Sequence, residues 1–446
     1  MGVNDRDFQS VSGMVLRHGR MVRSTRESMR QGKRPAVVIL WLLACIITGL
    51  APATAFSAER LAAFAARIAG DDARTRIVMD FDQKPEATVR YIGNPDRIVV
   101  DLPATVFAFP AEALVARGLF RDIRFGSIDA THSRIVLTTA RPAKLVLTDI
   151  RKNDEGRKDG EEPRSEAGQG FRLILDAEMT DNDTFSKLVA SQAWDADAYS
   201  TGKSPRIEQA APATDGEFLI AVDAGHGGID TGATGKTTNT PEKTVTLGFA
   251  RALAAELNRQ KGVKAFLTRD GDTFLSLSQR VTLARQKGAN LFISLHADML
   301  GQANIRGATV YTISDKASDH LAEAAAAREN QSDEVGGVDA SAEPQEVSDI
   351  LADLTRRETQ AFSIAMAKSV VTSFDGQINL INNPHRFAGF RVLQAQDVPS
   401  VLLELGFLSN KDDEKLLLDP AWRGKVVKLI AEAVKKYRQP LVAKGG

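Results

Sequence analysis

The chain has 446 residues, 43% of them hydrophobic, which is enough to form the packed cores of two domains. Lysine and arginine together number 57, as do aspartate and glutamate, so the charge balance predicts neither a nucleic acid nor an acidic partner.

Residues 1–55 have the features of a secretory signal peptide. An arginine-rich stretch precedes the apolar run "AVVILWLLACIITGL" at 36–50, and Ala53 and Ala55 are placed as in an A-x-A cleavage site. Fifteen apolar residues are short for a membrane span, so we expect no stable span after cleavage, although an uncleaved anchor is the alternative. Cleavage would remove Cys45, the only cysteine, and any metal would then be held by histidines and carboxylates.

Residues 72–180 are predicted to form a small antiparallel β domain. Six short runs alternate apolar with polar residues, which is the pattern of strands with one buried face, at 75–82, 87–93, 97–103, 133–139, 143–150 and 171–178. The charged stretch 151–170 is expected to be a long hairpin loop. Residues 181–215, rich in Ala, Ser, Asp and Thr, are predicted to be a linker.

Residues 216–440 show a different pattern, in which strand-like runs alternate with longer helical ones. "EFLIAVD", "KAFLTR", "NLFISLHAD", "GATVYTIS" and "VPSVLLELG" are the predicted strands. Residues 240–262 are a predicted helix, with Thr240 as N-cap, Pro241 at the first helical position and Gly262 at the end. This alternation predicts an α/β domain with a mixed, mostly parallel sheet covered by helices.

The loop after the first of these strands, "VDAGHGGIDTGATGKT" at 222–237, is rich in glycine. It matches a phosphate-binding loop poorly, because Asp230 replaces the first glycine of G-x-x-x-x-G-K-T and would repel a phosphate. The following helix is also expected to begin at Thr240, beyond Lys236. We interpret the glycines as room for a substrate next to a metal.

Two of the six histidines, His226 and His296, follow apolar strands. Sites in open α/β sheets form at the carboxyl ends of strands, so these imidazoles can share a metal; a packed or surface histidine is the alternative for each. Glu242, in the first turn of the helix after the loop, can reach back toward His226 or simply favour the helix dipole. Two histidines and one glutamate form a known open zinc site.

Glu404 ends another apolar strand, "SVLLELG", where an acidic side chain is costly unless it is paired or functional. Such a carboxylate can take a proton from the attacking water and pass it to a leaving amine. Zinc lowers the pKa of water to about 7, which makes hydroxide available at neutral pH.

Four blocks of this region resemble the motifs of zinc-dependent N-acetylmuramoyl-L-alanine amidases of the amidase-3 type. They are "VDAGHGGIDTGATG", "PEK", "ISLHAD" and "VPSVLLELGFLSN", in this order, and the resemblance covers about 218–438. That family cuts the amide between muramic acid and L-alanine in peptidoglycan. The resemblance implies that His226, Glu242 and His296 bind Zn2+ and that Glu404 is the catalytic acid/base. The preceding β domain resembles the AMIN domain, which targets such enzymes to the cell wall or division site.

The stretch 315–375 is far longer than a simple crossover needs, and helices are expected at 317–338 and 348–374. It resembles the regulatory segment of division-associated members of the family, in which a helix blocks the zinc site until a LytM-type activator displaces it. We expect a carboxylate of this segment, Glu329 first, to take the open zinc position; an ordinary helical insertion is the alternative. The resemblance implies a periplasmic enzyme of a Gram-negative bacterium that splits the septal wall in cell division.

Two other functions fit parts of the pattern. A catalytically silent wall-binding protein would have little use for the carboxylate of Glu404. Another zinc peptidase, such as a carboxypeptidase, commonly pairs His and Glu within a few residues, and no such pair occurs at His226 or His296. Asp223 and Asp298 either orient the histidines or are turn residues. His385, in "NNPHR", is expected to lie in a surface loop.

Overall fold

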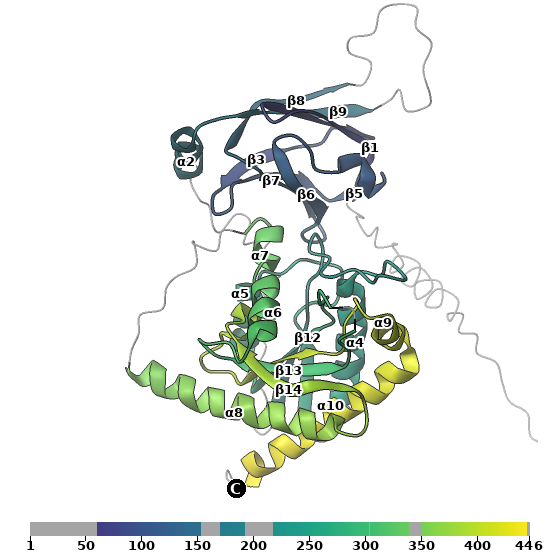
Figure 1. The fold of residues 1–446 in the computed structure, drawn as a ribbon, viewed down its shortest axis with the longest axis vertical. Helices are drawn as coiled ribbons and strands as arrows, with labels where there is room; N and C mark the ends of the chain where they lie inside the picture. The colour runs from purple at the N-terminus through teal and green to yellow at the C-terminus, as the bar shows by residue number, and fades with distance from the viewer. Residues whose placement is uncertain (1–59, 153–169, 192–216, 303, 339–349, 444–446) are drawn as a thin grey trace, which may run out of the picture. The chain divides into compact units, whose positions relative to one another are not determined.

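The computed structural model describes residues 60–152, 170–191, 217–302, 304–338 and 350–443 (Figure 1). The predicted signal peptide at 1–55 lies outside them, as do most of the predicted hairpin loop and of the linker. Within the described ranges, no helix is both long and apolar enough to cross a membrane.

Two β-sheets form the first region, for which the alternating pattern predicts a small antiparallel β domain. Their strands are β1 Leu61–Gly70, β2 Arg74–Phe81, β3 Thr88–Ile92, β4 Arg97–Pro103, β5 Thr105–Phe107, β6 Phe120–Ser127, β7 His132–Thr139, β8 Ala143–Lys152 and β9 Phe171–Met179. One sheet has the order β5-β1-β2-β9-β8 and the other β3-β4-β7-β6. All pairs are antiparallel except β1 with β5. Alternate residues such as Ile77 and Met79 of β2 and Ile98 of β4 point into one shared apolar core, so the region is a β-sandwich.

Three strands of this region, β1, β5 and β6, are absent from the sequence prediction. The segment of β1, "LAAFAARIAG", is rich in alanine and has little strand propensity, and its pairing with β2 and β5 holds it as a strand. The predicted linker contains helix α2, Asn182–Ser191, where the side chain of Asp181 accepts a hydrogen bond from the Thr184 N–H.

A six-stranded mixed sheet forms the second region. Its strands are β10 Phe218–Ala224, β11 Val263–Leu267, β12 Leu291–His296, β13 Ala308–Ile313, β14 Leu380–Ala388 and β15 Ser400–Glu404, in the order β11-β10-β12-β15-β13-β14. Neighbouring strands are parallel except β13 and β15. The helices are α4 Glu242–Leu257, α5 Leu277–Gln286, α6 His320–Glu329, α7 Ser332–Val335, α8 Ile350–Phe374, α9 Lys411–Leu418 and α10 Pro420–Ala443.

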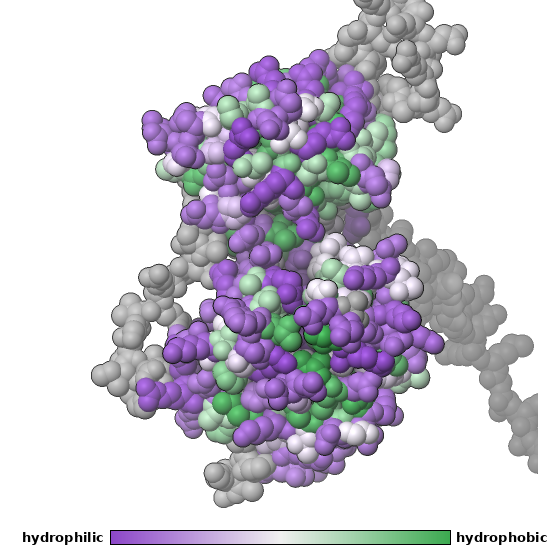
Figure 2. All heavy atoms as spheres, viewed as in Figure 1, coloured by the Kyte–Doolittle hydropathy of each residue, from purple (hydrophilic) through white to green (hydrophobic). Residues whose placement is uncertain are grey.

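The helices cover both faces of this sheet (Figure 1). Ile220 and Val222 of β10 pack against α4, α8 and α10, whereas Ala221 faces the opposite side, with α5 and α6. Strands buried on both faces explain the continuous apolar runs of the sequence. In the space-filling view, polar residues cover most of the visible surface (Figure 2). On the second region, apolar residues gather in the middle of the visible face.

Two local expectations are wrong. Helix α4 begins at Glu242 after Pro241, whose extended backbone makes it the N-cap in place of Thr240, and it ends at Leu257, before Gly262. His385 lies in strand β14 and not in a surface loop: it is half-buried, and its Nε2 lies 3.1 Å from Thr312 Oγ1 of β13. Parallel pairing with β13 holds this segment extended despite its asparagines and proline.

Candidate metal centre

Three neighbouring strands bring chemically active side chains to one edge of the second sheet. β12 lies between β10 and β15 and is parallel to both, so the carboxyl ends of all three strands are aligned. His296 and Glu404, the last residues of β12 and β15, face each other in register. His226 follows β10 by two residues, and Glu242 opens helix α4 behind the glycine-rich loop.

The imidazoles of His226 and His296 converge on two carboxylates. Oε2 of Glu242 lies 3.2 Å from His226 Nε2, and its Oε1 lies 3.4 Å from His296 Nδ1. Oε2 of Glu329, from α6, lies 3.0 Å from His296 Nδ1 and 3.5 Å from His226 Nε2. All four side chains are buried, and one ligand atom from each lies within 4.8 Å of the others.

The donor atoms of this cluster fit a metal ion. His226 Nε2, His296 Nδ1 and Glu329 Oε2 are buried and have no hydrogen-bond partner. Buried polar atoms without partners are rare, because each costs the free energy of its desolvation. Two imidazole nitrogens and carboxylate oxygens are the donor set that zinc prefers in open sites. These residues therefore have the chemistry and the convergence of a metal centre.

Backbone and side-chain groups orient the cluster. Asp230 Oδ2 lies 2.8 Å from His226 Nδ1, which directs Nε2 toward the carboxylates. The Ala233 and Ala297 N–H groups donate to the two oxygens of Glu242 at 2.9 and 2.7 Å. The N–H of Asp298 donates to Glu404 Oε2 at 2.9 Å, while Glu404 Oε1 is buried without a partner.

Burial and charge perturb the titration of the cluster in its metal-free form. Burial lowers the pKa of His296, but the carboxylates of Glu329 and Glu242 outweigh this effect and raise it to about 10. Burial raises the pKa of Glu404 well above its ordinary value, and the Asp298 and Glu329 carboxylates add to that rise against the opposing effect of His296. A carboxyl with a raised pKa is suited to exchanging protons near neutral pH.

The glycines of the loop make room for the cluster itself. A Cβ at Gly225 would lie 2.4–2.7 Å from atoms of the His296 ring. A Cβ at Gly232 would lie 2.6 Å from His226 Cδ2 and 2.7 Å from Glu242 Oε2. We interpreted these glycines as space for a substrate, but at these two positions the space is taken by the converging side chains.

Comparisons with known proteins show the family of this chain. The family model described as N-acetylmuramoyl-L-alanine amidase matches residues 220–436, and the AMIN domain model matches residues 65–160. N-acetylmuramoyl-L-alanine amidase AmiA of Escherichia coli (strain K12) is 38% identical over 50% of this chain and 76% of its own. N-acetylmuramoyl-L-alanine amidase AmiC of Neisseria meningitidis is 30% identical over 86% of this chain and 91% of its own. The chain belongs to the amidase-3 family of N-acetylmuramoyl-L-alanine amidases.

The amidase carries an AMIN domain before its catalytic region and hydrolyses peptidoglycan at the amide between muramic acid and L-alanine. Its sheet brings together every residue that the motifs single out: His226, Glu242, His296 and Glu404 meet at one edge. Glu329, the first candidate for a regulatory ligand, joins them from α6. The predicted helix at 317–338 is divided into α6 and α7 by Asn330 and Gln331.

Sequence reasoning missed three residues that support the cluster, one by direct contact and two through Asp298 and Asp230. Asp230 was noted only as a mismatch to a phosphate loop, although an acidic residue four positions after His226 is a usable signal for an orienting partner. Arg328 pairs with Asp298, and Ser332 Oγ donates to Asp230 Oδ2 at 2.6 Å. Nothing in the sequence indicates these last two contacts, because they depend on how α6 and α7 pack.

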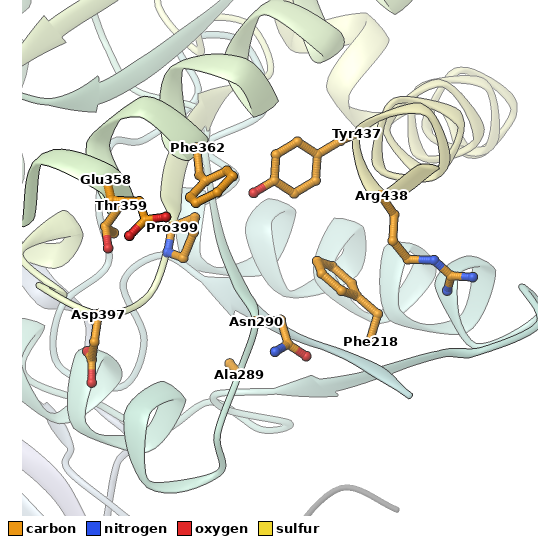
Figure 3. Close-up of a pocket in the computed structure, with 10 residues that line it drawn as sticks. All are labelled: Phe218, Ala289, Asn290, Glu358, Thr359, Phe362, Asp397, Pro399, Tyr437 and Arg438. Atoms are coloured by element: carbon orange, nitrogen blue, oxygen red, sulfur yellow. The ribbon is translucent and has the colours of Figure 1, made fainter. Parts of the chain in front are cut away.

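The amidase has a separate pocket at the opposite end of the same strands (Figure 3). Phe218 opens β10, Asn290 precedes β12 and Pro399 precedes β15, and all three line the pocket together with Phe362 of α8 and Tyr437 of α10. The length of the strands separates it from the metal centre, so this pocket is no part of the hydrolytic site.

Proposed function

We propose that His226, Glu242 and His296 hold a zinc ion and that Glu404 is the acid/base of the hydrolysis. The observation that carries the proposal is the convergence of buried nitrogen atoms that have no hydrogen-bond partner. His226 Nε2 and His296 Nδ1 both face the Glu242 carboxylate. When bound, zinc would polarise the scissile carbonyl and make a water molecule more acidic.

Glu404 is suited to move the proton that this reaction requires. The Asp298 N–H fixes its Oε2, so its Oε1 is left for the reacting water. Glu404 would accept a proton as water forms the new carbon–oxygen bond. It would return that proton to the nitrogen of L-alanine as the carbon–nitrogen bond breaks, because an amine leaves far more readily than its anion. The raised pKa of Glu404 favours the second transfer.

The same centre is proposed to be inhibited in the resting enzyme by Glu329. Oε2 of Glu329 would take the coordination position on zinc that substrate and water need. Glu329 is only 3% exposed. Arg328 donates to Asp298 Oδ2 through Nε and Nη2, at 2.9 and 2.5 Å, and Ser332 donates to Asp230. Residues 328–332 are thus held by one contact near each histidine, to Asp298 close to His296 and to Asp230 close to His226. A LytM-type activator would have to break these contacts.

The biological setting is proposed to be the periplasm of a Gram-negative bacterium, with septal wall splitting in division as the task. An AMIN domain and relatives such as AmiC of Neisseria meningitidis support this setting.

The reaction is tested by digesting purified muropeptides and analysing the products by mass spectrometry. We expect free stem peptides with L-alanine at the amino terminus; cleavage within the peptide would contradict the proposal. Inhibition is tested separately by deleting residues 317–338 and following dye release from sacculi. Release that does not rise would contradict the inhibitory role of this segment and leave the assignment of the reaction intact.

A further inference from the structure

The backbone of His226 adopts a conformation that residues other than glycine rarely take. Its φ is +61°, in the left-handed region, and four described residues other than glycine share a positive φ. The other three are Asn94, Asn239 and Asn383, and asparagine tolerates this region better than most residues. Strained backbone of this kind persists only where surrounding contacts hold it in place.

Two buried arginines hold the carbonyl groups of this turn. Arg280 of α5 donates through Nη1 to Ala224 O at 2.7 Å and through Nη2 to His226 O at 2.8 Å. Arg269 donates through Nε to Ala224 O and through Nη2 to Gly225 O, both at 2.9 Å. Three consecutive carbonyls are thus bound by guanidinium groups, and both arginines are almost fully buried, at 1% and 3% exposure.

Asp223 anchors Arg280 to the sheet. Its Oδ1 accepts from Arg280 Nη1 at 2.9 Å and from Thr268 Oγ1 at 2.6 Å, and its Oδ2 accepts from Ser294 Oγ at 2.7 Å. Thr268 follows β11 and Ser294 lies in β12, so the network joins three neighbouring strands at their carboxyl ends. A buried charge pair that is fully hydrogen-bonded sets a defined geometry.

We propose that Arg280, anchored by Asp223, is a positioning residue that holds the left-handed backbone at His226 and thereby aims Nε2 at the metal. Arg280 fixes the backbone of His226 and Asp230 fixes Nδ1 of its ring, so the two contacts together determine where Nε2 points. This inference rests on the proposed role of His226 as a metal ligand. Asp223 would then act on His226 through Arg280, and it would not need to contact either histidine directly.

Arg280→Lys is the primary test, because lysine keeps the positive charge beside Asp223 but lacks the planar fork that reaches two carbonyls and a carboxylate. Arg285→Lys, at an exposed position of the same helix, is the matched control. We expect zinc affinity of the full chain, measured against a competing chelator, to fall about 10- to 100-fold in Arg280→Lys only. The absorption spectrum of the Co2+-substituted protein should change as well, because it reports the ligand geometry. Unchanged affinity and spectrum in Arg280→Lys would overturn the proposal, even if activity were lost.

A milder pair covers the case in which Arg280→Lys does not fold. Thr268→Val removes one hydrogen bond to Asp223, and Thr268→Ser keeps the hydroxyl. We expect Thr268→Val to bind zinc several-fold more weakly than Thr268→Ser; equal affinities would overturn the proposal. His226→Ala distinguishes failure of the positioning role from failure of the ligand assignment. If this variant bound zinc as tightly as the unchanged chain, His226 would not be a ligand and the proposed function itself would be wrong.

Discussion

Oε2 of Glu329 lies 3.0 Å from Nδ1 of His296, at the position where a ligand of the proposed zinc would sit. The contact joins an insertion helix, α6, to the end of a central strand, β12. A carboxylate in this position would compete with both substrate and water for the metal. The proposed inhibition and the proposed chemistry therefore involve neighbouring side chains, Glu329 and His296, and each can be changed separately.

Substitution of Glu329 should activate the enzyme. Glu329→Gln keeps the shape of the side chain but removes the charge that binds a cation. We expect peptide release from sacculi to rise about 10- to 100-fold, which corresponds to about 1.4–2.7 kcal/mol of lost inhibition. Glu323→Gln, at an exposed position of the same helix, is the control. Equal activity of the two variants would show that Glu329 does not restrain the enzyme.

Loss of the Arg328–Asp298 pair should activate the enzyme more weakly. Arg328→Gln removes the guanidinium that donates twice to Asp298, so the insertion would be held by fewer contacts. We expect activity to rise several-fold, with a smaller increase than for Glu329→Gln, because the inhibitory carboxylate stays. A fall in activity would instead indicate that Arg328 supports the active form.

Substitutions of Glu404 and His226 should have different effects on turnover and on zinc content. Glu404→Gln removes the group that exchanges protons but no proposed ligand. Turnover should fall by about 10²–10⁴-fold, while zinc content, measured by mass spectrometry, stays as in the unchanged chain. His226→Ala should lose both zinc and turnover. Loss of zinc in Glu404→Gln would show that this residue is a ligand and not the acid/base.

Gly225→Ala should weaken metal binding. The added Cβ would meet the ring of His296 at 2.4–2.7 Å, and the imidazole would have to move. Gly271→Ala is a suitable control, because nothing lies within 4 Å of a Cβ at that position. Zinc affinity is the measurement, and equal affinity of the two variants would contradict the close packing of this loop.

Metal binding should release protons at neutral pH. The Glu329 and Glu242 carboxylates outweigh burial and raise the pKa of His296 to about 10 in the metal-free form, so its imidazole carries a proton at pH 7. Burial lowers the pKa of His226, but the carboxylates of Asp230, Glu242 and Glu329 outweigh this effect and raise it well above its ordinary value, so this imidazole is protonated too. Because ligating imidazoles must be neutral, binding should release about two protons, and zinc affinity should rise with pH up to about 10. Calorimetry in buffers of different ionisation enthalpy measures this release. Affinity that does not change with pH would contradict the assignment of His296 as a ligand.

The sequence predicted the fold class, and it also predicted which side chains converge at the ends of the strands. The convergence of His226, His296 and Glu404 could be predicted because each lies at or just after the end of an apolar strand, and parallel strands align their carboxyl ends. Strand β14 was missed because its asparagines and proline disfavour an isolated strand, and only pairing with β13 makes it one. The role of Arg280 could not be predicted, because the carboxylate of Asp223 and the carbonyls of Ala224 and His226 lie far from α5 in the sequence.

Zinc held by His226, Glu242 and His296 is proposed to drive the amide hydrolysis. The most direct measurement is release of L-alanine-terminated stem peptides by the Glu329→Gln variant before and after chelation, with zinc content determined in the same samples. We expect about one zinc per chain, loss of both zinc and peptide release on chelation, and recovery of both when zinc is added back. Peptide release that persists in the metal-free protein would contradict it.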